Sequence, residues 1–206
     1  MGIQEQLQQL IEVCHSAHDK GLVRASGGNA SIRSGNDIYI TPSGYSLRRI
    51  KVDDIVKVSI EGKISGSIKP SKELALHLSA YRSRPDVTTI LHVHSFYTII
   101  AGILAENFTA PLPPYTPGYV MKVGNPAMVG YFCPGSAELA QSIETALQSN
   151  SVVLMKNHGV VLVGNDMSTL LDKAEELESN ASIHIHLKGF GSLGSNAVAE
   201  IKAKYH

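Results

Sequence analysis

The stretch Thr89-Ile90-Leu91-His92-Val93-His94 is a short apolar run with two histidines at alternate positions. Its apolar and β-branched content predicts a strand buried in a sheet. Apolar residues at helical spacing on either side predict helices over 73–84 and 96–105. A strand that alternates with helices in this way is typical of α/β and α+β proteins. Because residues i and i+2 of a strand point to the same face, His92 and His94 would lie side by side.

The rest of the chain continues this mixture of strands and helices. The patterns predict further helices over 5–22, 136–148 and 166–188, and further strands over 38–40, 55–60, 152–155 and 159–163. Irregular segments are predicted at 26–31 (a small-residue loop), 110–128 (Pro- and Gly-rich) and 189–206 (a Gly/Ser-rich and then amphipathic tail). Neither a repeat nor a convincing linker divides the chain. The sequence therefore predicts a single domain over residues 1–206, of the α/β or α+β class.

The composition is that of an ordinary soluble protein without a strongly charged partner. The 206 residues are 43% hydrophobic and 17% charged, so a sizeable core is available. Eighteen basic residues balance eighteen acidic ones, which argues against broad electrostatic binding to nucleic acid. No apolar run approaches the ~20 residues that span a bilayer, and the first residues lack the basic region of a signal peptide. Cys14 and Cys133 are too few for a disulfide scaffold. We therefore expect a cytoplasmic protein that binds neither nucleic acid nor membrane.

Three of the nine histidines predict a metal site. His92 and His94 would share one face of a strand, and His158 lies in a short break between two apolar strands, where a side chain can emerge from the end of a sheet. Three neutral imidazoles with an open coordination position form a standard catalytic zinc site. Imidazole suits several metals, so Mn²⁺ and Co²⁺ stay alternatives to Zn²⁺. Glu73 could add a carboxylate, either as a fourth ligand or as a base.

Five of the remaining six histidines have structural explanations. His15, His18 and His77 lie on predicted helices, where we expect them to pack or to face solvent. His184 and His186 are two residues apart on a predicted helix, so they point to different faces and do not form a matching pair. A His-x-His pair taken alone is also often a surface or core pair.

Three short segments rich in glycine and hydroxyl groups predict a phosphate site. They are Ser26-Gly27-Gly28-Asn29, Ser43-Gly44 and Pro70-Ser71-Lys72. Glycine lets backbone N–H groups approach an anion, and Ser71 can cap the following helix so that its dipole points at a phosphate. Lys72 adds a positive point charge. Each segment alone is also typical of an ordinary turn.

Five motifs occur in one order along the chain. They are Gly27-Gly28-Asn29-Ala30-Ser31, Thr41-Pro42-Ser43-Gly44, Lys69-Pro70-Ser71-Lys72-Glu73, His92-Val93-His94-Ser95 and Asn157-His158-Gly159. This series resembles the class II aldolase/adducin family, which includes fuculose-phosphate and ribulose-phosphate aldolase-type enzymes. The resemblance runs from about residue 5 to residue 188, and five motifs in register are far more specific than any one of them.

The resemblance implies a three-layer αβα fold with a mostly antiparallel central sheet. It implies Zn²⁺ on His92, His94 and His158. It implies Glu73 as the acid/base, which also touches the metal when the site is empty. The phosphate cradle that it implies consists of Gly28, Asn29, Ser43, Gly44, Ser71 and Lys72.

The resemblance also implies a lyase reaction through a metal-stabilised enediolate. The metal would act as a Lewis acid when the bond next to a chelated carbonyl breaks. Many family members have a second serine where this chain has Lys72. Together with the downstream segment Tyr119-Val120-Met121-Lys122-Val123-Gly124, this variant looks more like the subgroup that decarboxylates 3-oxo-tetronate 4-phosphates to dihydroxyacetone phosphate. The alternatives are a fuculose-1-phosphate-type aldolase, a methylthioribulose-1-phosphate dehydratase and a non-catalytic adducin-type module.

Family aldolases also use a tyrosine near the metal. Tyr119 is the first candidate to protonate a leaving oxygen and Tyr115 the second, while Tyr205 is the candidate for a tyrosine in the C-terminal tail. For each of them the structural alternative is a packed aromatic ring with a satisfied hydroxyl. The resemblance further implies a homotetramer with active sites at subunit interfaces.

Overall fold

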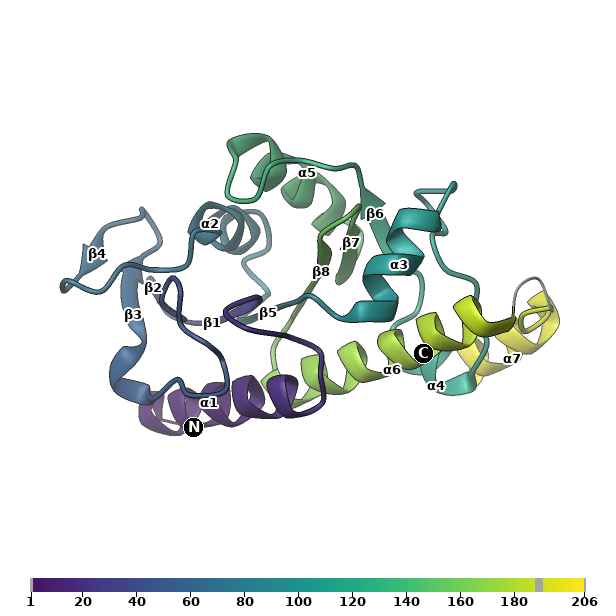
Figure 1. The fold of residues 1–206 in the computed structure, drawn as a ribbon, viewed down its shortest axis with the longest axis horizontal. Helices are drawn as coiled ribbons and strands as arrows, with labels where there is room; N and C mark the ends of the chain where they lie inside the picture. Colours follow the sequence, from purple (N-terminus) through teal and green to yellow (C-terminus); the bar gives the residue numbers. More distant parts are fainter. Residues whose placement is uncertain (1, 188–190, 206) are drawn as a thin grey trace.

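One sheet organises the molecule, and its strands follow the order β4-β3-β2-β1-β5-β8-β7-β6 (Figure 1). A computed structural model describes residues 2–187 and 191–205. The strands are β1 (Asn29–Ser34), β2 (Asp37–Ile40), β3 (Val56–Ser59), β4 (Ile64–Ser65), β5 (Thr89–Val93), β6 (Ala127–Val129), β7 (Val152–Met155) and β8 (Gly159–Gly164). Neighbouring strands are antiparallel except β6 and β7, which are parallel. The predicted mixed α/β fold with a mostly antiparallel sheet is thereby confirmed.

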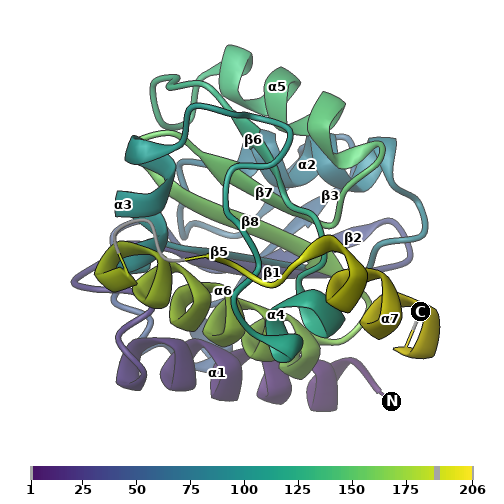
Figure 2. The same cartoon turned by 90° about the vertical axis from the view of Figure 1, so that its right-hand side faces the viewer.

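Helices cover both faces of this sheet (Figure 2). They are α1 (Ile3–Asp19), α2 (Leu74–Ser83), α3 (Phe96–Leu104), α4 (Pro117–Lys122), α5 (Ala137–Leu147), α6 (Met167–Leu187) and α7 (Ser195–Tyr205), with a 3₁₀ turn η1 (Val52–Asp54). The pair α2 and α5 packs on one face, and α1 and α6 pack on the other. The arrangement gives three layers, helix on sheet on helix.

The central strand β5 shows how the sequence builds these layers. All five of its residues are buried. Leu91 and Val93 join the core that includes α1 and α6, whereas Ile90 joins the core that includes α2 and α5. Since alternate strand residues face opposite sides, His92 points to the same side as Ile90, toward α2.

Most of the predicted elements are present, and those that were missed are short or polar. Strand β1 lies where we predicted a small-residue loop; its polar side chains Asn29 and Ser31 are buried, which a polarity pattern does not reveal. Helix α4 lies inside the predicted Pro- and Gly-rich segment, with Thr116 as its cap and Pro117 in its first turn. Strands β4 and β6 span two and three residues, and α7 occupies the predicted amphipathic tail. Residue 188, the predicted end of a helix, and residues 189, 190 and 206 of the predicted tail lie outside the described residues.

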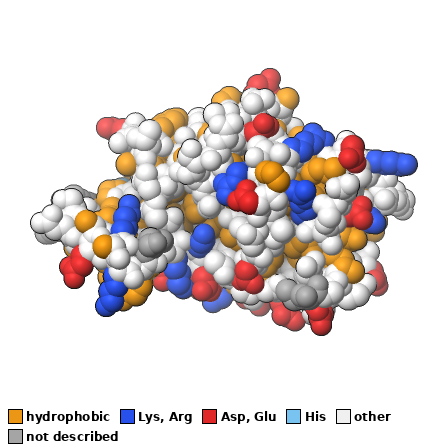
Figure 3. Space-filling model, turned by 180° about the vertical axis from the view of Figure 1, so that it is seen from behind, with side chains coloured by type: hydrophobic (Ala, Val, Ile, Leu, Met, Phe, Trp, Pro, Cys, Tyr) orange, Lys and Arg blue, Asp and Glu red, His pale blue; other side chains and the backbone are white. Residues whose placement is uncertain are grey.

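The distribution of charged side chains on the surface agrees with the equal numbers of basic and acidic residues. Basic and acidic side chains are interspersed on the face shown in Figure 3. Among the described helices, none combines the length and the hydropathy needed to cross a bilayer.

Candidate functional site

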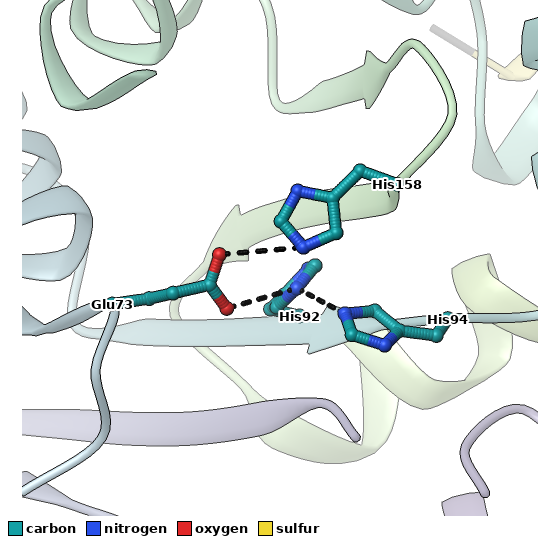
Figure 4. Close-up of side chains that lie close together, drawn as sticks. All are labelled: Glu73, His92, His94 and His158. Atoms are coloured by element: carbon teal, nitrogen blue, oxygen red, sulfur yellow. Dashed lines mark hydrogen bonds and ion pairs between the residues drawn. The ribbon is translucent and has the colours of Figure 1, made fainter. Parts of the chain in front are cut away.

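Three histidines meet at one end of the strand pair β5 and β8 (Figure 4). His92 lies in β5, His94 follows its last residue, and His158 immediately precedes β8. The two strands are antiparallel, so the end of one lies beside the start of the other. The ring centroids are 4.5 Å (His92–His94), 5.1 Å (His92–His158) and 5.0 Å (His94–His158) apart. The structure therefore brings together the three predicted metal ligands.

Gly159 makes room for this cluster. A Cβ atom at this position would lie 2.3 Å from the Val93 carbonyl oxygen and 3.0 Å from the His94 ring. Such distances are far inside van der Waals contact, so a side chain here would displace backbone or ligands. Asn157, two residues earlier, adopts a left-handed conformation with φ 60°, which turns the chain back into β8 after His158.

A buried carboxylate completes the cluster. Glu73 is the N-terminal cap residue of α2, and its side chain points into the space between the histidine rings (Figure 4). Its Oε2 lies 3.1 Å from His92 Nε2, and its Oε1 lies 3.5 Å from His158 Nε2. The four potential ligand atoms of Glu73, His92, His94 and His158 all lie within 4.8 Å of one another.

The hydrogen-bonding chemistry of this cluster fits a cation. His92 Nδ1 donates to the Val160 carbonyl at 2.9 Å, so in a neutral ring its Nε2 carries a lone pair. That lone pair faces Glu73 Oε2, which is also an acceptor, and lies 2.7 Å from His94 Nε2. Glu73 Oε1 is buried and has no hydrogen-bond partner among the described residues. A positive charge at the centre satisfies all of these atoms, and imidazole with carboxylate is a donor set that suits Zn²⁺ and related divalent metals.

Three of the four pKa shifts in the cluster, those of Glu73, His94 and His158, favour the protonation state that binds a metal, and that of His92 opposes it. Burial, followed by the charges of neighbouring histidines, lowers the pKa of His94 to about 3 and that of His158 to about 4. Burial would raise the pKa of Glu73, but the His92 charge and hydrogen bond hold it well below its usual range. Burial would likewise lower the pKa of His92, but the charge of Glu73 raises it instead. At neutral pH, Glu73 is ionised and His94 and His158 are neutral.

The predicted phosphate residues gather in one pocket beside this cluster. The pocket has a volume of about 290 Å³. All six predicted residues line it, namely Gly28, Asn29, Ser43, Gly44, Ser71 and Lys72. Glu73, His94 and His158 line it as well, so the candidate anion site and metal site open into the same space. A larger hollow of about 660 Å³ lies elsewhere, between the N-terminal part of α3 and α6, and none of the cluster residues lines it.

Two loops that are distant in sequence line this pocket and pair through their backbones. Ser43 N donates to the Lys69 carbonyl, and Ser71 N donates to the Thr41 carbonyl. Ser71 Oγ accepts the backbone N–H of Glu73 at 3.2 Å. The predicted capping role of Ser71 is therefore exerted on the cap residue Glu73 rather than within the first turn of α2. These bonds bring Ser43, Ser71 and Lys72 together in the lining of one pocket.

Gly28 has a packing reason to be glycine in addition to its predicted anion contact. Its φ is 74°, and a Cβ atom there would lie 2.8 Å from the His92 carbonyl oxygen and 2.5 Å from Val23. Any side chain would push β1 away from β5. Asn29, the next residue, sits opposite His92 in the β1–β5 register, and its amide donates to Glu73 Oε2 at 2.8 Å.

The candidate tyrosines lie away from the described lining of this pocket. Tyr119 is buried in the core on the α6 side, and its hydroxyl donates to the Leu112 carbonyl. It has the packed and satisfied arrangement that is the structural alternative to a catalytic role. Tyr115 is half-buried and hydrogen-bonded to His184 Nδ1 at 2.9 Å, and Tyr205 is exposed.

Two residues near the site were not predicted from the sequence, namely His77, which bonds to the pocket residue Asn29, and Pro134. His77, expected to pack or to face solvent, is buried one helical turn after Glu73 and bonds to Asn29 and Ser31. Its i+4 spacing from Glu73 was the available signal, because such residues share one helix face. Pro134 also lines the pocket, and no local pattern marks it.

Comparison with known proteins identifies a common family. The model of the Class II Aldolase and Adducin N-terminal domain matches residues 8–185. A 3-oxo-tetronate 4-phosphate decarboxylase of Haemophilus influenzae is 34% identical over 187 residues, covering 89% of this chain and 89% of the relative. An L-fuculose phosphate aldolase of Methanocaldococcus jannaschii is 36% identical over 176 residues, covering 85% of this chain and 93% of the relative.

Solved structures give the same result for the fold. The crystal structure of YgbL from Klebsiella pneumoniae superposes with a TM-score of 0.91 at 27% identity, covering 98% of this chain and 99% of that one. An L-fuculose 1-phosphate aldolase structure superposes with a TM-score of 0.83 at 28% identity, covering 97% and 95%. The three-layer architecture is thus shared along nearly the full length of both proteins.

Proposed function

Because the chain belongs to the class II aldolase and adducin family, we propose that it is a metal-dependent lyase that breaks a carbon–carbon bond in a phosphorylated keto sugar or keto sugar acid. The specific reaction that we propose is decarboxylation of a 3-oxo-tetronate 4-phosphate to dihydroxyacetone phosphate. The observation that carries the proposal is that Glu73, His94 and His158, three members of the four-residue cluster, open into the same pocket as the candidate anion-binding residues. A substrate phosphate and its reacting carbonyl could therefore be held at once.

We propose that His92, His94 and His158 hold Zn²⁺, with Mn²⁺ and Co²⁺ as alternatives. When bound, such an ion supplies Lewis-acid stabilisation of negative charge on a substrate oxygen. Glu73 is buried and ionised, so beside the cluster it is the group that can remove a proton from carbon and, once it has taken up that proton or one from water, return it.

The pocket residues would hold the phosphate away from the reacting bond. The hydroxyl groups of Ser43 and Ser71 and the Lys72 ammonium are donors at its opening, and the backbone around Gly28 and Gly44 adds N–H groups. Binding energy at this remote group would orient the substrate toward Glu73. Decarboxylation releases CO₂ and leaves an enediolate, which must take up one proton on carbon; Glu73 would take that proton from water in the pocket and pass it to the carbon.

A class II sugar-phosphate aldolase is the second candidate. It would leave the same enediolate but release an aldehyde, so this pocket suits both reactions. The observation that favours it is the 36% identity to the Methanocaldococcus jannaschii enzyme, which is comparable to the 34% identity to the Haemophilus influenzae decarboxylase. Lys72, in place of a second serine, favours the decarboxylase.

We also propose a cytoplasmic homotetramer with active sites at subunit interfaces. In support, none of the described residues lining the pocket is a tyrosine, so a phenol that takes part in the reaction would come from another copy of the chain. Phe96, Leu104 and Tyr131 are large apolar side chains exposed on the single chain, as expected for subunit contacts. Light scattering of the purified protein tests the oligomeric state, and a monomer would contradict it.

The experiment that tests the enzymatic proposal is hydrogen–deuterium exchange of dihydroxyacetone phosphate. The metal-loaded protein is incubated with this compound in D₂O while the hydroxymethyl protons are followed by NMR. We expect stereospecific exchange that is lost in a Glu73→Gln variant. No exchange by a protein with bound metal would refute both the decarboxylase and the aldolase. Release of CO₂ or of an aldehyde from the full substrate then separates the two.

A further inference from the structure

A chain of buried hydrogen bonds runs from Glu73 into the sheet, on the side away from the pocket. Asn29 Nδ2 donates to Glu73 Oε2 at 2.8 Å. His77 Nε2 lies 2.6 Å from Asn29 Oδ1, and Ser31 Oγ lies 2.7 Å from His77 Nδ1. All four side chains are buried, with His77 and Ser31 fully inaccessible to solvent.

The chemistry of these groups fixes the direction of every bond. A carboxylate only accepts hydrogen bonds, so Asn29 must present its NH₂ group to Glu73 and its Oδ1 to His77. His77 Nε2 must then donate, which leaves the lone pair on Nδ1 and requires Ser31 to donate to it. Burial lowers the pKa of His77 to about 3, so the ring stays neutral and this is its single tautomer.

The far end of the chain is anchored in the core. Tyr81 Oη lies 2.8 Å from Ser31 Oγ and 3.0 Å from the Ser31 carbonyl. Burying so many polar groups is costly unless every one is satisfied, and apolar residues would fill the same space more simply. His77, Ser31 and Tyr81 do not line the pocket, so they would not contact a substrate there. They can instead orient Asn29 and Glu73, which do line it.

We propose that His77 is a positioning residue, which as its Nε2–H tautomer locks the side-chain amide of Asn29 in the one orientation that holds Glu73. The locked amide has two hydrogens. One is bonded to Glu73 Oε2, and we expect the second to be available to an anion, because Asn29 also lines the pocket. Asn29 thus connects the anion site to the acid/base group, and His77 fixes that connection. The catalytic consequence rests on the proposed role of Glu73.

The reason for the lock is that an asparagine amide can flip at little steric cost. Without a donor at His77 Nε2, Asn29 Oδ1 would be a buried acceptor without that partner, which offsets the preference of Glu73 for the NH₂ group. A flipped amide would place Oδ1 beside Glu73 Oε2, at the position that Nδ2 now occupies 2.8 Å away. Two acceptors at that distance repel each other, so the carboxylate would turn away from its place beside His92. A group that must reach a substrate carbon would then be misplaced.

The first test reads the tautomer directly and needs no turnover. Long-range ¹H–¹⁵N correlation spectra of the full chain, with and without Zn²⁺, report which ring nitrogen of each histidine carries the hydrogen. We expect His77 to be neutral at pH 7 with its hydrogen on Nε2 in both samples. A hydrogen on Nδ1, or an imidazolium ring, would overturn the proposal.

The second test replaces His77 with glutamine or asparagine, two amide side chains that differ in length by one methylene group. His77→Gln can place an NH₂ group near the position of Nε2, whereas His77→Asn reaches only as far as Nδ1 and cannot contact Asn29. We expect His77→Asn to lower kcat for dihydroxyacetone phosphate exchange about tenfold or more with a smaller change in KM, and His77→Gln to recover most of the loss. His15→Asn is the control, because His15 bonds to the Ile50 carbonyl outside this network.

Equal impairment of the two His77 variants, or wild-type kcat in a folded His77→Asn protein, would contradict the positioning role. If the wild-type protein shows no exchange, the proposed function fails, and Zn²⁺ affinity becomes the readout. His77→Asn should then bind Zn²⁺ about tenfold more weakly than His77→Gln, because Glu73 has lost its orientation. If His77→Asn does not fold, the tautomer measurement decides.

Discussion

His92 Nε2 lies 3.1 Å from Glu73 Oε2, and both side chains are buried although His92 already uses its Nδ1 hydrogen on the Val160 carbonyl. When the His92 ring is neutral, its Nε2 and Glu73 Oε2 are two acceptors held together away from water, which is unfavourable unless a positive charge, either a proton or a metal ion, lies between them. The fold maintains this arrangement through backbone that cannot easily move, namely β5, the start of β8 and the first turn of α2. The cluster can therefore hold a cation, and removal of single ligands tests whether it does.

His94→Ala is expected to reduce bound metal from one ion per chain to a small fraction of that, and to abolish exchange of dihydroxyacetone phosphate. The reason is that the remaining ligands would be two histidines and a carboxylate around a larger opening. Elemental analysis after dialysis measures the metal content. His186→Ala is the control, since the His186 ring contacts the Ser182 carbonyl and Tyr97 rather than the cluster. An active, metal-free His94→Ala protein would refute the metal site.

Metal affinity should depend on pH through a single proton. Ligand nitrogens must be deprotonated, and the low pKa values of His94 and His158 leave them free of protons above about pH 5. The pKa of His92 is raised by Glu73, so His92 is the ligand that must lose a proton as metal binds. Affinity should fall as pH drops below the pKa of His92, by about tenfold per unit.

Titration with Co²⁺ between pH 5.5 and pH 8, followed by its absorption spectrum, measures this slope. A change of two or three orders of magnitude per pH unit would mean that several ligands carry protons in the metal-free protein. That result would contradict the protonation states assigned to His94 and His158.

Gly159→Ala is expected to destabilise the fold and to weaken metal binding together. The added methyl group would meet the Val93 carbonyl at 2.3 Å and the His94 ring at 3.0 Å. Overpacking of this kind costs about 1–3 kcal/mol, and the strain falls on the strand junction that carries the ligands. Urea unfolding gives the loss of stability. Gly191→Ala is the matched control, because no atom lies within 4 Å of its added Cβ, and it should leave both properties unchanged.

Sequence patterns were sufficient for the strands and helices whose apolar residues repeat regularly. The apolar and β-branched content of residues 89–94 predicted β5, and the alternation of side chains along a strand predicted that His92 and His94 lie side by side, as they do in the structure. Strand β1 was missed because Asn29 and Ser31 point inward as polar residues. Their partners Glu73 and His77 lie more than forty residues away in the chain, so the reason for burying them is tertiary.

The same limit applies to the site. The sequence was sufficient to predict which residues are the candidate ligands. The contact between His158 and His92 depends on the pairing of β5 with β8, which no local sequence pattern specifies. Tyr119 was the first tyrosine candidate, yet helix α4 turns its ring into the core, where Leu112 satisfies the hydroxyl. The short Pro- and Gly-rich segment around it gave no apolar period from which that orientation could be derived.

The two cysteines should differ sharply in reactivity. Cys14 is fully buried on α1, and burial raises the pKa of its thiol to about 12, so almost no thiolate is present at pH 8. Cys133 is exposed beside Pro134, which lines the pocket. We expect iodoacetamide to label one cysteine in the native protein and both in denaturant, as read by mass spectrometry. Rapid labelling of Cys14 under native conditions would show that α1 opens locally.

Lys72 should contribute to substrate affinity through its charge. It is an exposed side chain at the opening of the pocket that holds Ser71 and Gly44, where a phosphate would be met by hydroxyl and backbone donors. Hydrogen bonds to a charged group contribute about 1.5–3 kcal/mol, so Lys72→Met should raise the KM for dihydroxyacetone phosphate about tenfold or more, with a smaller effect on kcat.

Lys72→Arg retains the charge and should stay within a few-fold of the wild-type KM. Added salt provides an independent check, because screening weakens an exposed charge contact. Raising the ionic strength should therefore increase the wild-type KM more than that of Lys72→Met. If Lys72→Met instead binds the phosphate as tightly as the wild type at every salt concentration, the anion is held by the hydroxyl and backbone donors alone. Lys72 would then face the end of the substrate opposite the phosphate. In that case Lys72→Met should raise the KM of a substrate that carries a carboxylate more than the KM of a sugar phosphate that carries none.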